Sequence, residues 1–214
     1  MKKSKKQLRQ RGFTLMELLL VVLLLSIIVG AVFSQIDRAQ VRYKVEDQKL
    51  DMTQQEREFI DQFTRDLHQA GFPSASMLGG AGTANQIALG LISISNNDLV
   101  MEGDVDGDGV VERVEYSYFD GSGWAGPGPN PCPCIRRSSM AKGSAGPATN
   151  FTQVQNVIGT SFFTALNSTG GVATDLPSTK AVQITLTTQG LTQDSDVQKS
   201  IQVTMTGIAR LVNN

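Results

Sequence analysis

The strongest constraint on this chain is an apolar run of 21 residues, Phe13 to Phe33, in which only Thr14, Glu17 and Ser26 are polar. A helix of about 20 apolar residues spans the roughly 30 Å hydrocarbon core of a bilayer. Glu17 is the exception, because a carboxylate in lipid is costly and generally has a partner elsewhere. The run therefore predicts a membrane-spanning helix with a second role that involves Glu17.

Charge is distributed unevenly along the sequence. The first 11 residues hold six basic side chains and no acidic one, which leaves 13 basic against 20 acidic residues in the remainder. By the positive-inside rule, the basic segment stays in the cytoplasm and the acidic remainder lies across the membrane. The negative charge of the remainder argues against a nucleic-acid-binding protein. Abundant glycine and few aromatic residues favour an extracytoplasmic domain rich in β-structure and loops.

A processing motif precedes the apolar run. The basic leader ends at Gly12, and the small-residue cleavage site of an ordinary secretory signal is not evident after the run. The sequence RGFTLMELLLVVLLL resembles the class III signal of type IV pilins and the related pseudopilins, over residues 6–35. The resemblance implies that prepilin peptidase cuts between Gly12 and Phe13, and that Phe13 becomes N-methylated. It also implies that Glu17 pairs with the N-terminal amine of a neighbouring subunit.

The chemistry of these residues agrees with the resemblance. Cleavage leaves a positively charged amine on Phe13. Pairing this amine with a neighbour's Glu17 neutralises two charges, each of which would cost several kcal/mol if left unpaired in an apolar filament core. Gly12 suits the peptidase because a residue without a side chain lets another backbone approach closely. A plain signal anchor with an accidental glutamate is the alternative.

The helix is expected to continue well beyond the membrane. No proline occurs between Phe13 and Ala70, and the sequence Gly71-Phe72-Pro73 supplies a stop. Apolar residues in its second half recur with the spacing of a helix face packed on a sheet. They are Phe59, Ile60, Phe63 and Leu67.

The segment after the helix has the alternating pattern of half-buried antiparallel strands. The predicted fold class is therefore α+β, a pilin-like architecture in which a long N-terminal helix packs on an antiparallel β-sheet head. The strands are expected at residues 86–94, 98–102, 110–119, 134–139, 154–166, 181–188 and 197–211. The chain divides into a cleaved leader (1–12), a transmembrane and assembly half of the helix (13–35), an amphipathic half (36–71) and the head (72–214).

The loop-dominated stretch 120–150 interrupts these strands and is the expected variable or partner-facing surface. It contains Trp124, the only tryptophan. Trp124 either covers an edge of the core or presents a contact to a partner.

A second chemical signal lies in the head. The sequence GDVDGDGVVERVE, residues 103–115, fits the calcium-loop pattern D-x-D-x-D-G-x5-E. The candidate ligands are Asp104, Asp106, Asp108, the carbonyl of Val110, and Glu112 or Glu115. The flanks look like strands, so we expect a Ca²⁺ loop at a hairpin tip, where a straight strand over residues 110–119 favours Glu112. The alternative is a solvated Asp-Gly turn.

The two cysteines, Cys132 and Cys134, lie in the sequence Pro-Cys-Pro-Cys. Export to an oxidising compartment allows a disulfide between them, with free or intermolecular thiols as the alternatives. Zinc is not favoured, because the chain has one histidine and no second ligand pair nearby. The sequence shows no nucleophile–base pattern, and its single His68 lies in the predicted helix, so we do not expect an enzyme.

The head also resembles a subclass of the family. The sequence EREFIDQFTRDLHQAGFP, the acidic turn before VERVEYSY and the closing strands of residues 180–214 look like PilW-like minor pilins and J-type pseudopilins. The resemblance implies a minor pilin that helps to initiate or prime a type IV pilus. The alternatives are a J-type pseudopilin of a type II secretion system and, in another class, an adhesive or ligand-binding tip module.

The resemblance further implies the partners and the location of the chain. The partners would be other pilin or pseudopilin subunits, prepilin peptidase and the inner-membrane assembly platform. The chain would cross the bacterial inner membrane once with its N-terminus in the cytoplasm, and would then enter a periplasmic or cell-surface filament.

Overall fold

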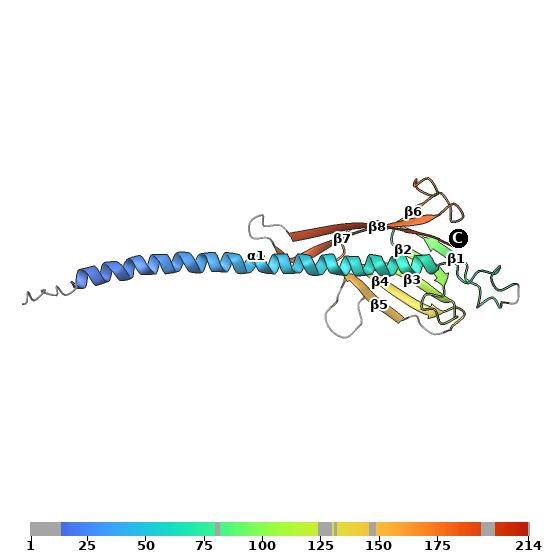
Figure 1. Ribbon diagram of the computed structural model, residues 1–214, viewed down its shortest axis with the longest axis horizontal. Helices are drawn as coiled ribbons and strands as arrows, with labels where there is room; N and C mark the ends of the chain where they lie inside the picture. Colours follow the sequence, from blue (N-terminus) through green and yellow to red (C-terminus); the bar gives the residue numbers. More distant parts are fainter. Residues whose placement is uncertain are drawn as a thin grey trace, which may run out of the picture. The chain divides into compact units, whose positions relative to one another are not determined.

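The computed structural model describes residues 14–79, 82–123, 130, 132–145, 149–193 and 200–213. Within these residues, a long helix, α1 (Leu15–Gln69), is followed by eight strands (Figure 1). The strands are β1 (Gly90–Ile94), β2 (Asp98–Gly103), β3 (Glu112–Phe119), β4 (Cys134–Ala141), β5 (Thr149–Gln155), β6 (Phe163–Leu166), β7 (Ala181–Gln193) and β8 (Ser200–Arg210). The predicted α+β architecture, a long N-terminal helix packed on antiparallel sheet, is confirmed.

The chain forms two compact parts, one ending at Lys44 and the other running from Val45 to Asn214. The second part contains two antiparallel sheets. One has the order β1-β2-β3-β4-β5 and the other the order β6-β7-β8. Both are meanders, so within each sheet every strand pairs with its neighbour in sequence, the commonest arrangement of consecutive strands.

The C-terminal turns of α1 pack against both sheets through the predicted apolar face. Phe63 is fully buried at the centre of this contact. Its ring lies 5.2 Å from that of Tyr116 on β3 and 5.8 Å from that of Phe163 on β6, centroid to centroid. Pairs of aromatic rings at such distances add about 0.5–1.5 kcal/mol beyond the area that they bury.

Two acidic residues of α1 lie on the same buried face. The carboxylate of Asp66 accepts hydrogen bonds of 2.6 Å each from the Tyr116 hydroxyl and from Nε of Arg137 on β4. The carboxylate of Glu56 accepts a 2.8 Å hydrogen bond from the Thr188 hydroxyl on β7. Burial, and then the charge of Asp66, raise the pKa of the Tyr116 hydroxyl well above its usual value, so this hydroxyl stays a donor. These polar contacts fix which turn of the helix faces which strand.

The helix ends where the sequence predicts. Gly71 has a φ of 80°, and its N–H donates to the Glu102 carbonyl at 2.9 Å. A Cβ at this position would lie 2.6 Å from the carbonyl oxygen of Asn213. Only glycine combines the left-handed backbone with this close approach.

Several strand predictions need correction. Strand β7 runs to Gln193 rather than residue 188, and β3 begins at Glu112 rather than residue 110. A single strand over residues 154–166 is wrong, because β5 ends at Gln155 and β6 begins only at Phe163. The break follows from Asn156, which has a φ of 54° and therefore leaves the extended conformation. Strand β5 also begins at Thr149, in a stretch assigned to loop, and β1 begins at Gly90 rather than at residue 86.

Candidate functional site

Glu17 lies in the first turn of α1. Thr14 precedes the helix, and the N–H of Glu17 donates to the Thr14 hydroxyl oxygen at 3.3 Å and to the Thr14 carbonyl at 3.1 Å. Thr-x-x-Glu is the sequence of a capping box, in which the hydroxyl satisfies an amide that the helix leaves unpaired. A carboxylate here also faces the positive end of the helix dipole. The adjacent predicted cleavage site, Gly12 and Phe13, lies outside the described residues.

The apolar side chains around Glu17 are uncovered. Every described residue from Thr14 to Gln40 is exposed, and large apolar residues from Leu15 to Ile36 expose 42–78% of their surface. Within the part of the chain that the structure describes, α1 is the one helix long and apolar enough to cross a membrane. An apolar surface of this extent requires lipid or other protein around it.

The acidic loop joins β2 to β3 at the tip of a hairpin, beyond the pair Gly103 and Glu112. Asp104 is buried, and its two carboxylate oxygens accept hydrogen bonds from the N–H groups of Gly107 (2.8 Å) and Gly109 (3.1 Å). Both glycines have positive φ values, 79° and 86°, which allow the loop to curl back on Asp104. Carboxylate oxygens of Asp104, Asp106 and Asp108 lie within 4.8 Å of one another.

Glu112 closes this loop, whereas Glu115 lies apart from it. The carboxylate of Glu112 accepts a 3.0 Å hydrogen bond from the Val105 N–H. Burial raises the pKa of the Glu112 carboxyl, and the nearby charges of Asp106, Asp108 and Asp104 raise it further. Glu115 is three residues along β3, in register with Val100 of β2. Because side chains alternate along a strand, Glu115 is on the opposite face from Glu112.

The donor set of the loop suits a hard cation. Ca²⁺ takes six to eight oxygen ligands, with carboxylates prominent among them. Asp104, Asp106, Asp108 and Glu112 supply four carboxylates in one loop. The Val110 carbonyl belongs to the same turn, where the Val110 N–H donates to the Asp108 carboxylate at 2.8 Å.

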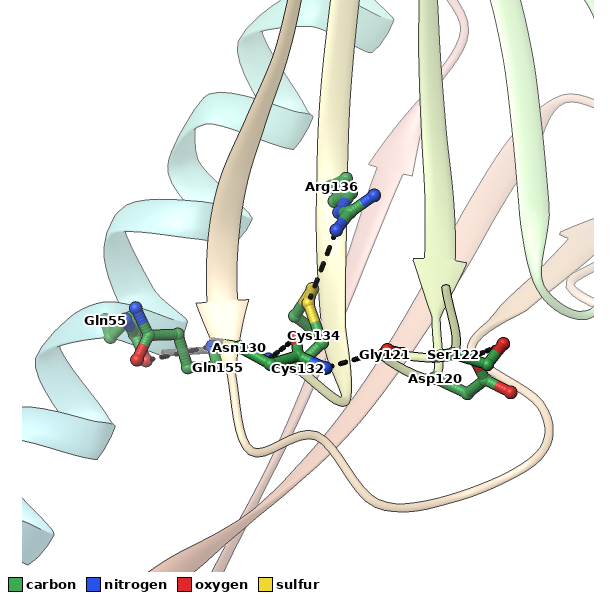
Figure 2. The surroundings of a disulfide bond; sticks show 9 residues. All are labelled: Gln55, Asp120, Gly121, Ser122, Asn130, Cys132, Cys134, Arg136 and Gln155. Carbon is green, nitrogen blue, oxygen red and sulfur yellow. Dashed lines mark hydrogen bonds between the residues drawn. A yellow bond between two sulfur atoms is a disulfide. The ribbon is translucent and has the colours of Figure 1, made fainter. Parts of the chain in front are cut away.

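The two cysteines form a disulfide at the start of β4 (Figure 2). Cys134 is fully buried, whereas Cys132 is partly exposed. Asn130 supports the approach to β4, because its side chain donates to the Gly121 carbonyl at 2.7 Å and accepts from the Cys132 N–H at 3.1 Å. Trp124, the other feature of the predicted loop, lies outside the described residues.

Comparison with known families decides the class of the N-terminal segment. Residues 7–33 match the family model described as the prokaryotic N-terminal methylation motif. The chain carries a type IV pilin-like class III signal. No curated protein and no solved structure matched the chain.

This class III signal indicates the kind of protein to which the exposed helix belongs. It supports a type IV pilin or pseudopilin-like protein, a class of structural subunits rather than enzymes. Together with the apolar helix, it fits a membrane-anchored pilin that is processed by prepilin peptidase and assembles with other pilin subunits.

Sequence reasoning missed the two buried acids of α1, Glu56 and Asp66. Polar residues in this half of the helix suggest exposure, yet both side chains are 1% exposed or less. Their spacing from the apolar residues of the helix is the feature of the sequence that predicts their burial. Glu56 precedes Phe59 by three residues and Asp66 follows Phe63 by three, so both fall on the apolar face of the helix.

Proposed function

We propose that this chain is a minor pilin of a type IV pilus, which helps to initiate filament assembly after prepilin peptidase has removed residues 1–12. The observation that carries the proposal is Glu17, a carboxylate in the first turn of an otherwise apolar and fully exposed helix segment within a class III signal. Although it lies in the first turn of the helix, a carboxylate this far into the apolar run is costly for a subunit that stays in lipid. A subunit that must recognise another N-terminus gains a partner for that charge.

The proposed mechanism uses the helix in two environments. Before assembly, residues 13–35 hold the subunit in the bacterial inner membrane with the leader in the cytoplasm. After cleavage and methylation, the amine of Phe13 is the natural partner for Glu17 of an adjacent subunit. The assembly platform lifts the subunit out of lipid, and the charge pair sets the axial register between neighbouring helices.

Replacing Glu17 with alanine tests this role. We expect incorporation of the variant into filaments to fall by about tenfold or more, because an unpaired amine in an apolar environment is penalised by several kcal/mol. Asp37→Ala is the matched control, since Asp37 is an exposed acid of the same helix beyond the apolar run. Incorporation is measured by immunoblotting of sheared filaments against the membrane pool. Wild-type incorporation of the Glu17→Ala variant would overturn the proposed function.

The sheared-filament and membrane fractions also distinguish a type IV pilus from a secretion pseudopilus. A minor pilin co-purifies with sheared surface pili, and its deletion reduces their number. Recovery of the chain only in a periplasmic pseudopilus, with a secretion defect on deletion, would assign it instead as a J-type pseudopilin of a type II secretion system. An adhesive tip module would show ligand binding that Trp124→Ala abolishes, a substitution that leaves β4 (Cys134–Ala141) in place.

We further propose that the acidic loop holds a calcium ion. Asp104, Asp106, Asp108 and Glu112 would supply carboxylate ligands, with the Val110 carbonyl beside them. The ion would neutralise carboxylates that otherwise repel one another and would stiffen the β2–β3 hairpin tip. Magnesium suits the site less well, because it requires near-octahedral geometry and keeps its waters.

Calorimetric titration of the full-length chain in detergent tests this site. We expect Ca²⁺ to bind with a Kd of about 10⁻⁴–10⁻³ M, the range of extracellular calcium sites. Asp106→Ala should abolish the binding heat, because it removes the central ligand of the loop. Glu115→Ala is the matched control and should bind normally, since Glu115 lies apart from the loop. A wild-type chain that gives no heat at millimolar Ca²⁺ would contradict the proposal.

A further inference from the structure

We propose that the Cys132–Cys134 disulfide is a thiol–disulfide exchange site, in which an external thiol attacks the sulfur of Cys132. This redox site is separate from the acidic loop and from the assembly helix, and it does not depend on the proposed pilin function.

The two cysteines differ in exposure. Cys134 is fully buried in β4, in register with Phe119 of β3 and Gln155 of β5. Cys132 precedes the strand and is partly exposed. We therefore expect an incoming thiolate to attack Sγ of Cys132 rather than Sγ of Cys134. When the thiolate attacks Cys132, the sulfur that leaves is that of Cys134, which stays inside the fold.

The fold gains little from this disulfide. The two cysteines are two positions apart, so the bond closes a very short loop. In the chain-entropy account, the stabilisation by a disulfide grows with the number of residues that the bond closes off, so this bond contributes little. Backbone pairing to β3 and β5 already holds Cys134, and Asn130 holds the Cys132 N–H. Reduction should therefore leave the second part of the chain folded.

A cation is held beside the accessible sulfur. Nη2 of Arg136 lies 3.8 Å from Sγ of Cys132 (Figure 2). The guanidinium carbon of Arg136 is 3.6 Å from the centroid of the Phe119 ring, and this contact fixes the side chain in place. An arginine stays protonated at any physiological pH. A positive charge near a cysteine favours its thiolate, the form that reacts.

Asp120 is an acidic residue near the same end of the sheet. It follows β3, and its carboxylate accepts hydrogen bonds from the Ser122 N–H (2.8 Å) and the Ser122 hydroxyl (2.7 Å). Figure 2 shows Asp120 beside Ser122, on the other side of Gly121 from the disulfide. The charged group in contact with Sγ of Cys132 is the guanidinium of Arg136.

The chemistry balances with two equivalents of a monothiol. The first thiolate attacks Sγ of Cys132, the Cys132–Cys134 bond breaks, and Cys134 leaves as a thiolate that takes up a proton. A second thiolate then attacks the external sulfur of the mixed disulfide and releases Cys132 as a thiolate beside Arg136. The protein gains two electrons and one proton, which Cys134 holds, Cys132 stays a thiolate, and the two monothiols are oxidised to their disulfide with release of one proton to water. The reverse sequence reduces an external disulfide.

Full-length protein in detergent, incubated with reduced glutathione and then trapped with iodoacetamide, tests the site by mass spectrometry. We expect glutathione on Cys132 and not on Cys134 in the mixed disulfide. After full reduction, Cys132 should be alkylated about tenfold faster than Cys134, because Cys134 is fully buried and Cys132 is partly exposed beside a cation. The circular dichroism spectrum should stay that of the folded protein. A disulfide that resists a large excess of glutathione, a mixed disulfide on Cys134, or unfolding on reduction would each overturn the proposal.

Variants of Arg136 test its role as a positioning residue. In Arg136→Gln, alkylation of reduced Cys132 at pH 7 should slow by about three- to tenfold, and its pH profile should move to higher pH. Arg136→Lys should restore much of the rate. Arg113→Gln is the matched control, because Arg113 lies at the end of β3 that is far from Phe119 and the disulfide. Unchanged alkylation in Arg136→Gln would refute the electrostatic role, and a failure of Arg136→Lys to restore the rate would count against it.

Discussion

Alanine in place of Asp66 is expected to destabilise the fold of residues 45–213 by about 3–5 kcal/mol, the usual cost of removing one partner of a buried ion pair. Asp66 is 1% exposed, and one of its oxygens accepts hydrogen bonds from both the Tyr116 hydroxyl and Nε of Arg137. The substitution leaves a guanidinium and a phenol without their acceptor, beneath the helix. It also removes the contact that ties α1 to both β3 and β4.

Denaturation of the full-length protein in detergent, followed by near-ultraviolet circular dichroism, measures this loss. Asp61→Ala is the matched control, because Asp61 is an exposed acid of the same helix, and its effect should stay within about 0.5 kcal/mol. The triple variant Asp66→Leu, Arg137→Met and Tyr116→Phe should recover much of the stability, since it leaves neither a buried charge nor the buried Tyr116 hydroxyl unpaired. A loss below about 1 kcal/mol for Asp66→Ala would show that the network does not hold the helix.

The class III signal could be identified from sequence because it is a local, linear motif. Its leader, its glycine and its glutamate act through their order in the chain, and the matched segment 7–33 requires no tertiary structure. The helix end was equally local, since Gly71 combines a positive φ with a stop before Pro73. Features of this kind depend on a few adjacent residues, so sequence reasoning reaches them.

The strands after β4 could not be delimited in the same way. Strand β5 begins with Thr149 and Asn150, which have the composition of a turn, and it exists because β4 pairs with it. Asn156 ends β5 through a single residue in the left-handed region. Both effects are set by a partner strand or by one backbone angle, neither of which the alternation of apolar residues reports.

The acidic loop lay between these two cases. Its aspartates and glycines define the loop locally, and their clustering follows from the positive φ values of Gly107 and Gly109. The expected straight strand over residues 110–119 favours Glu112 over Glu115, and the register of β3 shows where the two residues lie. The strand begins at Glu112, which places this residue at the loop and Glu115 on the opposite face.

Glutamine in place of Glu56 is expected to stabilise the protein at neutral pH by about 1 kcal/mol or more, because it removes a carboxyl group whose ionisation is disfavoured by burial. Glu56 is fully buried. One carboxylate oxygen accepts the Thr188 hydroxyl, and the other has no hydrogen-bond partner among the described residues. Burial raises the pKa of the Glu56 carboxyl, an effect that the hydrogen bond from Thr188 opposes only in part.

The sign of the pH dependence follows from this raised pKa. The folded state binds the Glu56 proton more tightly than the unfolded state, in which a glutamate titrates near pH 4.3. Wild-type stability is therefore highest when the carboxyl is protonated, and it falls as the pH rises from about 4.3 through the raised folded pKa. Glutamine does not titrate, so the advantage of Glu56→Gln should grow over this window and then level off.

The contribution of Glu56 is measured by denaturing wild type and variant at a series of pH values from about 4 to 8, which covers the range in which carboxyl groups titrate. Glu58→Gln is the matched control, since Glu58 is an exposed glutamate of the same helix that accepts a hydrogen bond from Gln54. Its stability profile should run parallel to that of the wild type. A parallel profile for Glu56→Gln would mean that the Glu56 carboxyl titrates as it does in the unfolded chain, and that its burial against β7 is relieved in solution. A widening gap would instead establish that the helix–sheet contact is stronger in acid than at neutral pH.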